Sequence, residues 1–470
     1  MPNSAVHCRL MDPREPVAVA QALAARPHLA FLDSGKDPSG LGRYSYVAAD
    51  PFGVFKVIGE RAYWNNVALS ARPFDALRVL LQRYQQPTAP GLPPFQTGAI
   101  GFLAYEAARL IEEVPGMAAP GSGIPDIELG FYDVVFVHDH ARNESMILSS
   151  GWPEMDAGER AIRANHRISK LLELIDAPFA QLSPNPSITT WNFDVTQESF
   201  EKSVSGTVER ILQGDLFQAN LAQRFIADLP DGYNPLTFYS TLRTMSPAPF
   251  GAYLGFEGIT VASNSPERFL TLKDRKIEAR PIKGTAARGE TSQTDKALAD
   301  ALLHSAKDRA ENTMIVDLLR NDLSRVSEPF SVKVPVLCGL ETYASVHHLV
   351  SVVEAQLADG CDQVDLLKAA FPCGSITGAP KIKAMEVIGQ VERVPRGIYC
   401  GSIGYFGFDG SMDLNVAIRT VTFQGNSVCF HAGGGITALS NPRDEYAETL
   451  VKAERIFQAF RHCGGDKGRA

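Results

Sequence analysis

The chain has 470 residues, of which 45% are hydrophobic and 21% charged, and its formal net charge is −8. A negative charge without a Lys/Arg run excludes a typical nucleic-acid binder, and no apolar run is long enough to span a membrane. The amino terminus predicts no signal peptide, and the seven cysteines lack disulfide or metal-ligand spacing, so we expect a reduced, cytoplasmic protein.

Residues 1–180 are predicted to form a first domain of short strands and helices. Apolar alternation predicts strands, spacing of leucines predicts a helix, and glycines precede an apolar strand that leads into a helix. The expected elements are strands at Leu29–Ser34 and Tyr44–Ala48, a helix at Asp75–Tyr84, a strand-to-helix segment at Gly98–Glu106 and one buried strand at Phe131–Val137.

Residues 177–194, rich in Pro, Ser, Thr and Asn, are predicted to link this part to a second domain at 195–460. That part has no strict strand–helix alternation and no internal repeat. The pattern favours an α+β fold, with antiparallel sheets and peripheral helices, over a doubly wound sheet. The expected elements are a helix at Gln197–Gln213 and strands at Leu216–Phe225, Gly251–Leu254, Ile259–Ala262 and Phe269–Leu272.

Lys283 stands in the stretch Ala279–Gly289, which follows a strand-like approach. Pro281 excludes a helix and Gly284 allows a turn, so Lys283 is expected at a tight corner. A desolvated amine there would be a nucleophile, whereas a lone lysine beside a turn is ordinarily a surface charge. The segment Ser265–Phe269, which contains Glu267, lies one hairpin upstream, and a helix that carries spaced carboxylates follows.

Two helices carry pairs of acids at a spacing of three residues. Asp308 and Glu311 lie in a predicted helix running from about Asp295 to Leu319, and Glu445 and Glu448 lie near the carboxyl end, with Lys452 one turn later. Each pair shares one helix face. Four carboxylates could hold Mg²⁺, although two solvated helix faces explain the same pattern.

Several polar residues interrupt apolar segments of the second domain. The backbone of Gly433, Gly434 and Gly435 could face an anion, or could simply end a strand. Arg419 lies inside the apolar run Leu414–Phe423 and needs a partner if buried, either a substrate carboxylate or a protein carboxylate. The remaining candidates of this kind are His348, Ser375 and Tyr399.

Two motifs stand close together, Ser-Pro-Glu-Arg-Phe at 265–269 and Pro-Ile-Lys-Gly-Thr at 281–285. With them the chain resembles the chorismate-utilising enzymes, and within them aminodeoxychorismate synthase component I. The resemblance spans about 195–460 and implies an antiparallel sandwich that binds chorismate over one Mg²⁺. By position it implies Glu311 and Glu448 as metal ligands, supported by Asp308 and Glu445. It implies substrate contacts by Tyr399, Arg419, Gly433, Gly434, Gly435 and Lys452, with His348 and Ser375 beside the departing C4 hydroxyl.

Two positions discriminate within this family. Isochorismate and salicylate synthases resemble one another in having a water-activating Lys where this chain has Gln218, and anthranilate synthases usually have Ala where it has Lys283. The resemblance therefore implies that Lys283 attacks C2 while Glu267 protonates the C4 hydroxyl, and that ammonia then replaces Lys283. The lysine pKa must fall through burial or a cationic neighbour, for which Arg280 and Arg288 are the nearest in sequence.

No glutaminase motif is present, so the resemblance implies a separate glutamine amidotransferase subunit that supplies ammonia. Some relatives hold tryptophan in the amino-terminal half, and Asp33–Ser34 with Pro247–Phe250 match that pattern only in part. Anthranilate synthase component I is the alternative reading. A non-catalytic subunit that binds chorismate or tryptophan is an alternative of another class.

Overall fold

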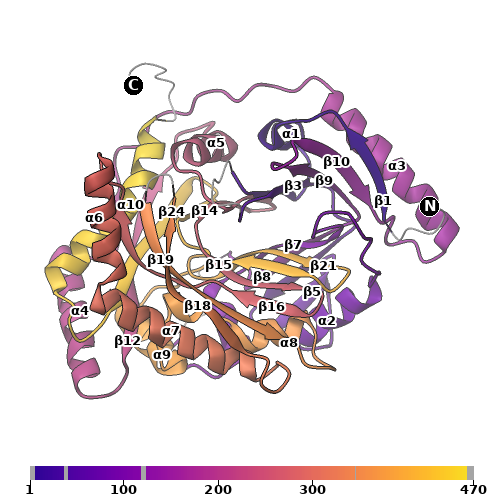
Figure 1. The fold of residues 1–470 in the computed structure, drawn as a ribbon. Helices are drawn as coiled ribbons and strands as arrows, with labels where there is room; N and C mark the ends of the chain where they lie inside the picture. Colours follow the sequence, from indigo (N-terminus) through magenta and orange to yellow (C-terminus); the bar gives the residue numbers. More distant parts are fainter. Residues whose placement is uncertain (1–5, 36–40, 118–122, 344–345, 463–470) are drawn as a thin grey trace.

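The computed structural model describes residues 6–35, 41–117, 123–343 and 346–462. Two large antiparallel sheets dominate this part of the chain, and helices cover their outer faces. Figure 1 shows α4, α6, α7, α9 and α10 gathered at one side of the molecule and α3 at the opposite side. None of the described helices combines the length and apolarity needed to span a bilayer.

The first sheet joins strands from both halves of the sequence. At its centre β2 pairs with β13, which brings residues 29–33 beside residues 251–255. The order is β1 (His7–Met11), β10 (Glu144–Ser149), β9 (Val134–Asp139), β3 (Tyr44–Ala48), β2 (Leu29–Asp33), β13 (Phe250–Phe256), β14 (Ile259–Ser265), β23 (Thr420–Gln424), β24 (Ser427–Ile436), β12 (Gln218–Asp228) and β11 (Asn192–Phe193), with β20 (Gly378–Ala379) also paired to β12.

The second sheet is likewise shared, because β21 pairs with β7. Its order is β17 (Ile282–Ala287), β19 (Val346–Gln356), β16 (Lys276–Ala279), β15 (Arg268–Lys273), β22 (Met412–Asn415), β21 (Ser402–Gly407), β7 (Gly98–Leu103), β8 (Ile127–Tyr132), β4 (Gly53–Ile58), β5 (Arg61–Trp64) and β6 (Val67–Ala68), with β18 (Lys333–Thr342) paired to β19.

The two sheets face each other across an apolar layer. Ile100 and Phe102 of β7 meet Ala252 and Leu254 of β13 there, as strand alternation requires for one buried face of each sheet. Separate apolar clusters fill the outer faces beneath the helices. The predicted α+β sandwich with peripheral helices is thus confirmed. The helices are α1 (Pro16–Ala22), α2 (Pro73–Arg83), η1 (Tyr105–Leu110), α3 (Ala157–Asp176), α4 (Gln197–Leu212), α5 (Pro235–Met245), α6 (Ser292–Leu303), α7 (Ala306–Ser324), α8 (Gln363–Ala370), η2 (Gly374–Ile376), α9 (Lys381–Glu392) and α10 (Pro442–His462).

Two apolar runs cross from one sheet to the other, and the first of them was expected to be a single strand. The run at 131–137 breaks at Asp133, whose buried carboxylate pairs with Arg163 and Arg167 of α3. The run at 414–423 breaks before Arg419, which has a positive φ of 51°. The prediction of one continuous strand at 131–137 was wrong, because apolar composition does not reveal a change of sheet.

The predicted helix from 295 to 319 is also two helices. His304 ends α6, and the Ser305 hydroxyl accepts a hydrogen bond from the Asp308 backbone N–H at the start of α7. A serine that caps a helix in this way begins a new segment rather than continuing an old one. Asp308 and Glu311 remain together on α7, and Asp308 lies in its first turn.

Candidate active site

Lys283 is presented by a β-bulge in β17 and not by the turn that we expected. Ile282 is opposite Val350 and Thr285 is opposite His348, so two residues of β17 face one residue of β19. Gly284 is the second of these two and has a φ of 81°. A bulge of this kind redirects a side chain out of the regular pleat. The bulge therefore decides where the Lys283 amine points.

The Lys283 amine and the Glu267 carboxylate meet at Ser375. Lys283 Nζ donates a 2.7 Å hydrogen bond to the Ser375 carbonyl oxygen. Ser375 Oγ donates a 2.7 Å hydrogen bond to Glu267 Oε1. Glu267 and Ser375 are both buried, and Ser375 belongs to η2, far along the chain from both partners. The fold thus assembles an amine, a hydroxyl and an acid from three separate segments.

Burial shifts the pKa values of both ionisable groups in directions that suit acid–base chemistry. It lowers the pKa of the Lys283 amine, against the opposing charges of Glu311 and Glu267, and Lys452 lowers it further. It raises the pKa of the Glu267 carboxyl, against the Ser375 hydrogen bond and the Lys283 charge. Both shifts favour the uncharged form, as desolvation always does.

The cations proposed to lower the Lys283 pKa were Arg280 and Arg288, and this expectation was wrong. Arg280 pairs with Glu341, and Arg288 pairs with Asp295. Each arginine therefore has an acidic partner of its own. The cation that does act on Lys283 is Lys452, which comes from α10 and is remote in sequence.

His348 lies beside the bulge with its ring fixed in place. Its Nδ1 lies 2.8 Å from Thr285 Oγ1, and its side chain is 4% exposed. Burial and the charge of Arg419 lower its pKa to about 4, so the imidazole is neutral near pH 7. A neutral ring can donate one hydrogen bond and accept another.

Arg419 is half-buried, and burial lowers its pKa. Its guanidinium makes no ion pair or side-chain hydrogen bond within the described part of the chain. A protein carboxylate was one of the two partners considered for this residue, and none is in place there. A charged group held in this way is suited to an anion from outside the protein.

The glycine strand β24 runs between the amine and the acids. A β-carbon on Gly435 would lie 2.2 Å from Gln218 Nε2 and 3.6 Å from Lys283 Nζ. A β-carbon on Gly434 would lie 3.2 Å from both Glu445 Oε2 and Glu448 Oε1. Side chains at Gly434 and Gly435 would therefore crowd these groups. Gly433 differs, because its β-carbon would collide with backbone, at 2.2 Å from the Leu221 carbonyl oxygen.

Gln218 is fully buried, and neither its amide oxygen nor its amide nitrogen has a hydrogen-bond partner among the residues that the structure describes. A buried amide without partners is costly, so the group ordinarily meets water or a ligand. Its place beside Lys283 and Gly435 makes it part of the same site.

The four predicted acids face one another from α7 and α10. Burial raises the pKa of Glu311, and the charges of Asp308 and Glu448 add to this, while Lys283 and Lys307 oppose it. Burial also raises the pKa of Glu445, whose carboxylate accepts a 2.6 Å hydrogen bond from Ser440. The oxygen Oε1 of Glu311 is buried and has no hydrogen-bond partner in the described part of the chain. Mutual repulsion and an unpartnered oxygen are what a cation would relieve.

Lysines supply the positive charge near these acids. Lys452 Nζ lies 2.7 Å from Glu448 Oε1 and donates a 2.8 Å hydrogen bond to the Gly433 carbonyl oxygen. The net pKa of Glu448 is lowered, because the Lys452 charge and hydrogen bond outweigh burial. Among the described residues, no three acidic, imidazole or thiol side chains stand close enough together to form a complete metal-ligand set.

Tyr399 is buried and stacks on His431, with ring centroids 5.1 Å apart and planes inclined by 12°. The Arg396 guanidinium lies over the same tyrosine, pairs with Glu392 and donates to the carbonyl oxygen of Asn220. Tyr399 is thus held rigidly from two sides.

Four residues that contribute to this site were not predicted from the sequence, namely Thr285, Lys307, Arg396 and His431. Lys307 precedes Glu311 by four residues on α7, and that helical spacing could have revealed it. Thr285 follows Lys283 by two residues in the strand, so the two side chains would lie on the same face of a regular pleat. Arg396 lies in a loop and His431 in a strand, where no local pattern indicates their contacts.

The partial tryptophan pattern maps to a separate cavity of about 210 Å³. Asp33, Ser34, Pro249 and Phe250 line it, together with Tyr44 and other residues of both sheets. Asp33 is already paired with Arg243 and accepts a hydrogen bond from Tyr239. A larger cavity of about 620 Å³ lies between α2 and the start of α8, and none of the predicted site residues lines it.

The chain as a whole is similar to known enzymes of one family. A family model described as "chorismate binding enzyme" matches residues 30–458. The chain is 37% identical to aminodeoxychorismate synthase component 1 of Escherichia coli over 93% of its length and 94% of that protein. It is 34% identical to anthranilate synthase component 1 of Aquifex aeolicus, covering 96% and 93%. Its fold matches the crystal structure of anthranilate synthase component I from Streptococcus pneumoniae with a TM-score of 0.78 and 32% identity, covering 88% of this chain and 92% of that one.

Proposed function

The chain belongs to the chorismate-binding enzymes, and from this premise we propose that it aminates chorismate at C4 to give 4-amino-4-deoxychorismate. The observation that carries the proposal is the pair of contacts at Ser375, which holds the Lys283 amine and the Glu267 acid on either side of one residue. Curated relatives with the amination and anthranilate activities match at similar identity. The choice between them therefore rests on Lys283 itself.

The proposed reaction has two displacements. The neutral Lys283 amine forms a bond to C2, both conjugated ring double bonds shift by one position, and the C4 hydroxyl leaves as water with a proton from Glu267. Ammonia then bonds to C4, both double bonds shift back, and Lys283 departs from C2 as a neutral amine. Glu267 regains its proton from the new ammonium group. Covalent catalysis of this kind divides one difficult displacement into two easier ones.

The chain's own residues have assigned roles in this proposal. Arg419, whose side chain has no partner among the described residues, would bind a substrate carboxylate. Tyr399 and the Gly433–Gly435 backbone would supply the further substrate contacts that the family resemblance implies. His348 is neutral and contacts the departing hydroxyl. Gln218 lies next to Lys283 and has free amide groups for the incoming ammonia. Lys452 helps to keep the Lys283 amine uncharged.

Mg²⁺ is part of the proposal, and the residues fit such an ion. Glu311 has a buried, unpartnered oxygen, and acids from α7 and α10 repel one another across the gap. Glu311 and Glu448 would hold the ion, with Asp308 and Glu445 in support. When bound, Mg²⁺ neutralises substrate carboxylate charge.

We further propose a separate glutamine amidotransferase as the source of ammonia, and 4-aminobenzoate for folate synthesis as the end use, in the cytoplasm. Tryptophan is a proposed second ligand of the 210 Å³ cavity that Asp33 and Phe250 line. Isothermal titration of the protein with tryptophan tests that binding directly. Loss of the heat signal in Asp33→Ala would place the ligand in this cavity.

The deciding experiment incubates the purified chain with chorismate, an ammonium salt at alkaline pH and Mg²⁺, and measures the mass and absorbance of the product. 4-Amino-4-deoxychorismate supports the proposal. Anthranilate with pyruvate would replace it with anthranilate synthesis on the same site. Absence of any turnover in folded protein that still binds chorismate would indicate a non-catalytic subunit.

A further inference from the structure

His347 precedes His348 in β19 but serves a different set of contacts. Its Nε2 lies 2.9 Å from Asp295 Oδ1, and its Nδ1 lies 2.9 Å from Thr342 Oγ1. The residue is 2% exposed. Both ring nitrogens are thus occupied inside the protein, on the opposite side of the strand from His348. Successive residues of a strand point to opposite faces, so this arrangement leaves His348 facing Thr285.

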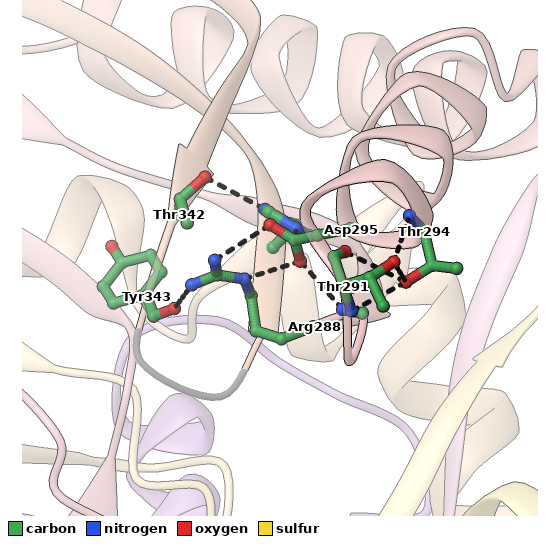
Figure 2. A network of polar contacts seen from close by, with 8 residues as sticks. Arg288, Thr291, Thr294, Asp295, Thr342 and Tyr343 are labelled. Atoms are coloured by element: carbon green, nitrogen blue, oxygen red, sulfur yellow. Dashed lines mark hydrogen bonds and ion pairs between the residues drawn. The ribbon is translucent and has the colours of Figure 1, made fainter.

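Asp295 is the centre of the network that Figure 2 shows. Arg288 donates to both of its carboxylate oxygens at 2.8 Å, and the Gly289 N–H donates to Oδ1 at 2.8 Å. Arg288 also donates to the Tyr343 carbonyl oxygen. The Arg288 hydrogen bonds, the Gly289 N–H and the His347 contact hold the pKa of Asp295 well below its usual range. We call Arg288, Asp295, Thr342 and His347 the Asp295 clasp.

The clasp joins four segments next to the Lys283 bulge. Arg288 directly follows β17, Asp295 lies in the first turn of α6, Thr342 ends β18, and His347 is the second residue of β19. In the sheet His347 is opposite Ala286 on one side and Thr342 on the other. The register slips between Ile282 and Thr285, immediately beyond these contacts. The clasp therefore holds β17, β18 and β19 together beside the bulge, where strand pairing sets the register.

We propose that Asp295 and His347 are positioning residues, which act from behind the sheet to hold His348 and the Lys283 bulge in their working register. This inference rests on the proposed function for its kinetic readout. Neither residue touches the site itself. Their effect passes through the backbone of β19 and through the Thr285–His348 contact.

The test compares three variants of the full-length chain. His347→Phe keeps a ring of similar size but loses both hydrogen bonds, and His347→Gln keeps a polar group that can reach Asp295. Thr294→Ala is the matched control, because Thr294 belongs to the same network in Figure 2 but only caps α6 through Thr291. Asp295→Asn, which is nearly isosteric, replaces the Phe variant if that protein does not fold.

We expect kcat for amination to fall about 30-fold in His347→Phe, with the KM for chorismate nearly unchanged, because small misplacement of reacting groups has effects of this order. His347→Gln should recover most of the rate, and Thr294→Ala should match the parent. Equal loss in the Phe and Gln variants, or equal loss in the control, would overturn the proposal in favour of a general packing role.

A second readout does not depend on the reaction. With ¹³C-labelled histidine, the ring signal of His348, identified by its loss in His348→Gln, reports the pH at which that imidazole takes up a proton. Release of the clasp should move this midpoint upward from its low value, because water reaches the ring. An unchanged midpoint in His347→Phe would refute the clasp even if the parent aminates chorismate. If the parent does not aminate chorismate, the proposed function fails while this measurement still decides the clasp.

Discussion

Ser375 donates its hydroxyl hydrogen bond to Glu267 at 2.7 Å, although the two residues are separated by more than a hundred positions in the sequence. This hydrogen bond opposes the effect of burial on the Glu267 pKa. Ser375 therefore limits how far the acid is shifted, in addition to lining the site.

Replacing Ser375 by Ala should move the alkaline limb of the pH–rate profile to higher pH. A general acid must be protonated, and loss of the hydrogen bond raises the Glu267 pKa further, so the protonated form persists to higher pH. The measurement is kcat/KM against pH. Glu267→Gln is the companion variant and should lose activity by about 100-fold or more. An alkaline limb that stays in place in Ser375→Ala would remove Glu267 as its origin.

Lys283→Ala should slow amination by at least about 100-fold, or change the product, because the covalent step is lost. In the parent, the rate should rise with pH as the amine loses its proton. Burial and Lys452 lower the Lys283 pKa, so the midpoint of that rise should lie below the ordinary lysine value of about 10.4. Product mass and the pH profile check both statements. A parent-like rate and product in the variant would exclude Lys283 from the mechanism.

Arg419→Gln should raise the KM for chorismate by roughly 10- to 100-fold, since a hydrogen bond between charged groups contributes about 1.5–3 kcal/mol. The free energy of unfolding should not fall, because Arg419 has no described protein partner to lose and its burial is costly. Chemical denaturation checks the second point. A clear loss of stability with unchanged KM would instead indicate a structural arginine.

Glu448→Ala should abolish most Mg²⁺-dependent activity, and Glu445→Gln should weaken the apparent Mg²⁺ affinity by about 10- to 100-fold, as expected for a supporting residue. The acids repel one another across the gap in the absence of a cation. Titration of activity with Mg²⁺ gives both values. Glu454→Gln is the matched control, because Glu454 lies on the same helix and pairs with Arg461. Normal titration curves for both site variants would refute the metal assignment.

Gln218→Lys should add a water-derived product to the mixture when ammonia is withheld. The new amine would lie in the same buried space beside Gly435 and Lys283, where it could take a proton from water. The nearby positive charge should also lower the Lys283 pKa further. Mass spectrometry of products formed without ammonia is the test. An inactive variant that still binds chorismate, with no hydroxylated product, would contradict the assignment of Gln218 to nucleophile choice.

The sequence alone determined whether most elements are helices or strands, and which residues are candidates for the active site. Strands such as Tyr44–Ala48 and the acid pairs on α7 and α10 could be predicted because alternation and helical spacing are local properties. Lys283 and Glu267 were identified as the candidate amine and acid for a similar reason, because each lies in a short local sequence motif.

Only the tertiary structure decided how these residues meet. The bulge that orients Lys283 depends on the pairing of β17 with β19. The chain passes from one sheet to the other near Asp133 and near Arg419, within apolar runs that look continuous in the sequence. The charges that act on Lys283 come from Glu311 on α7, from Glu267 and from Lys452 on α10, not from the arginines beside Lys283 in sequence. Such contacts join segments far apart along the chain, and a local pattern carries no information about a partner that is not local.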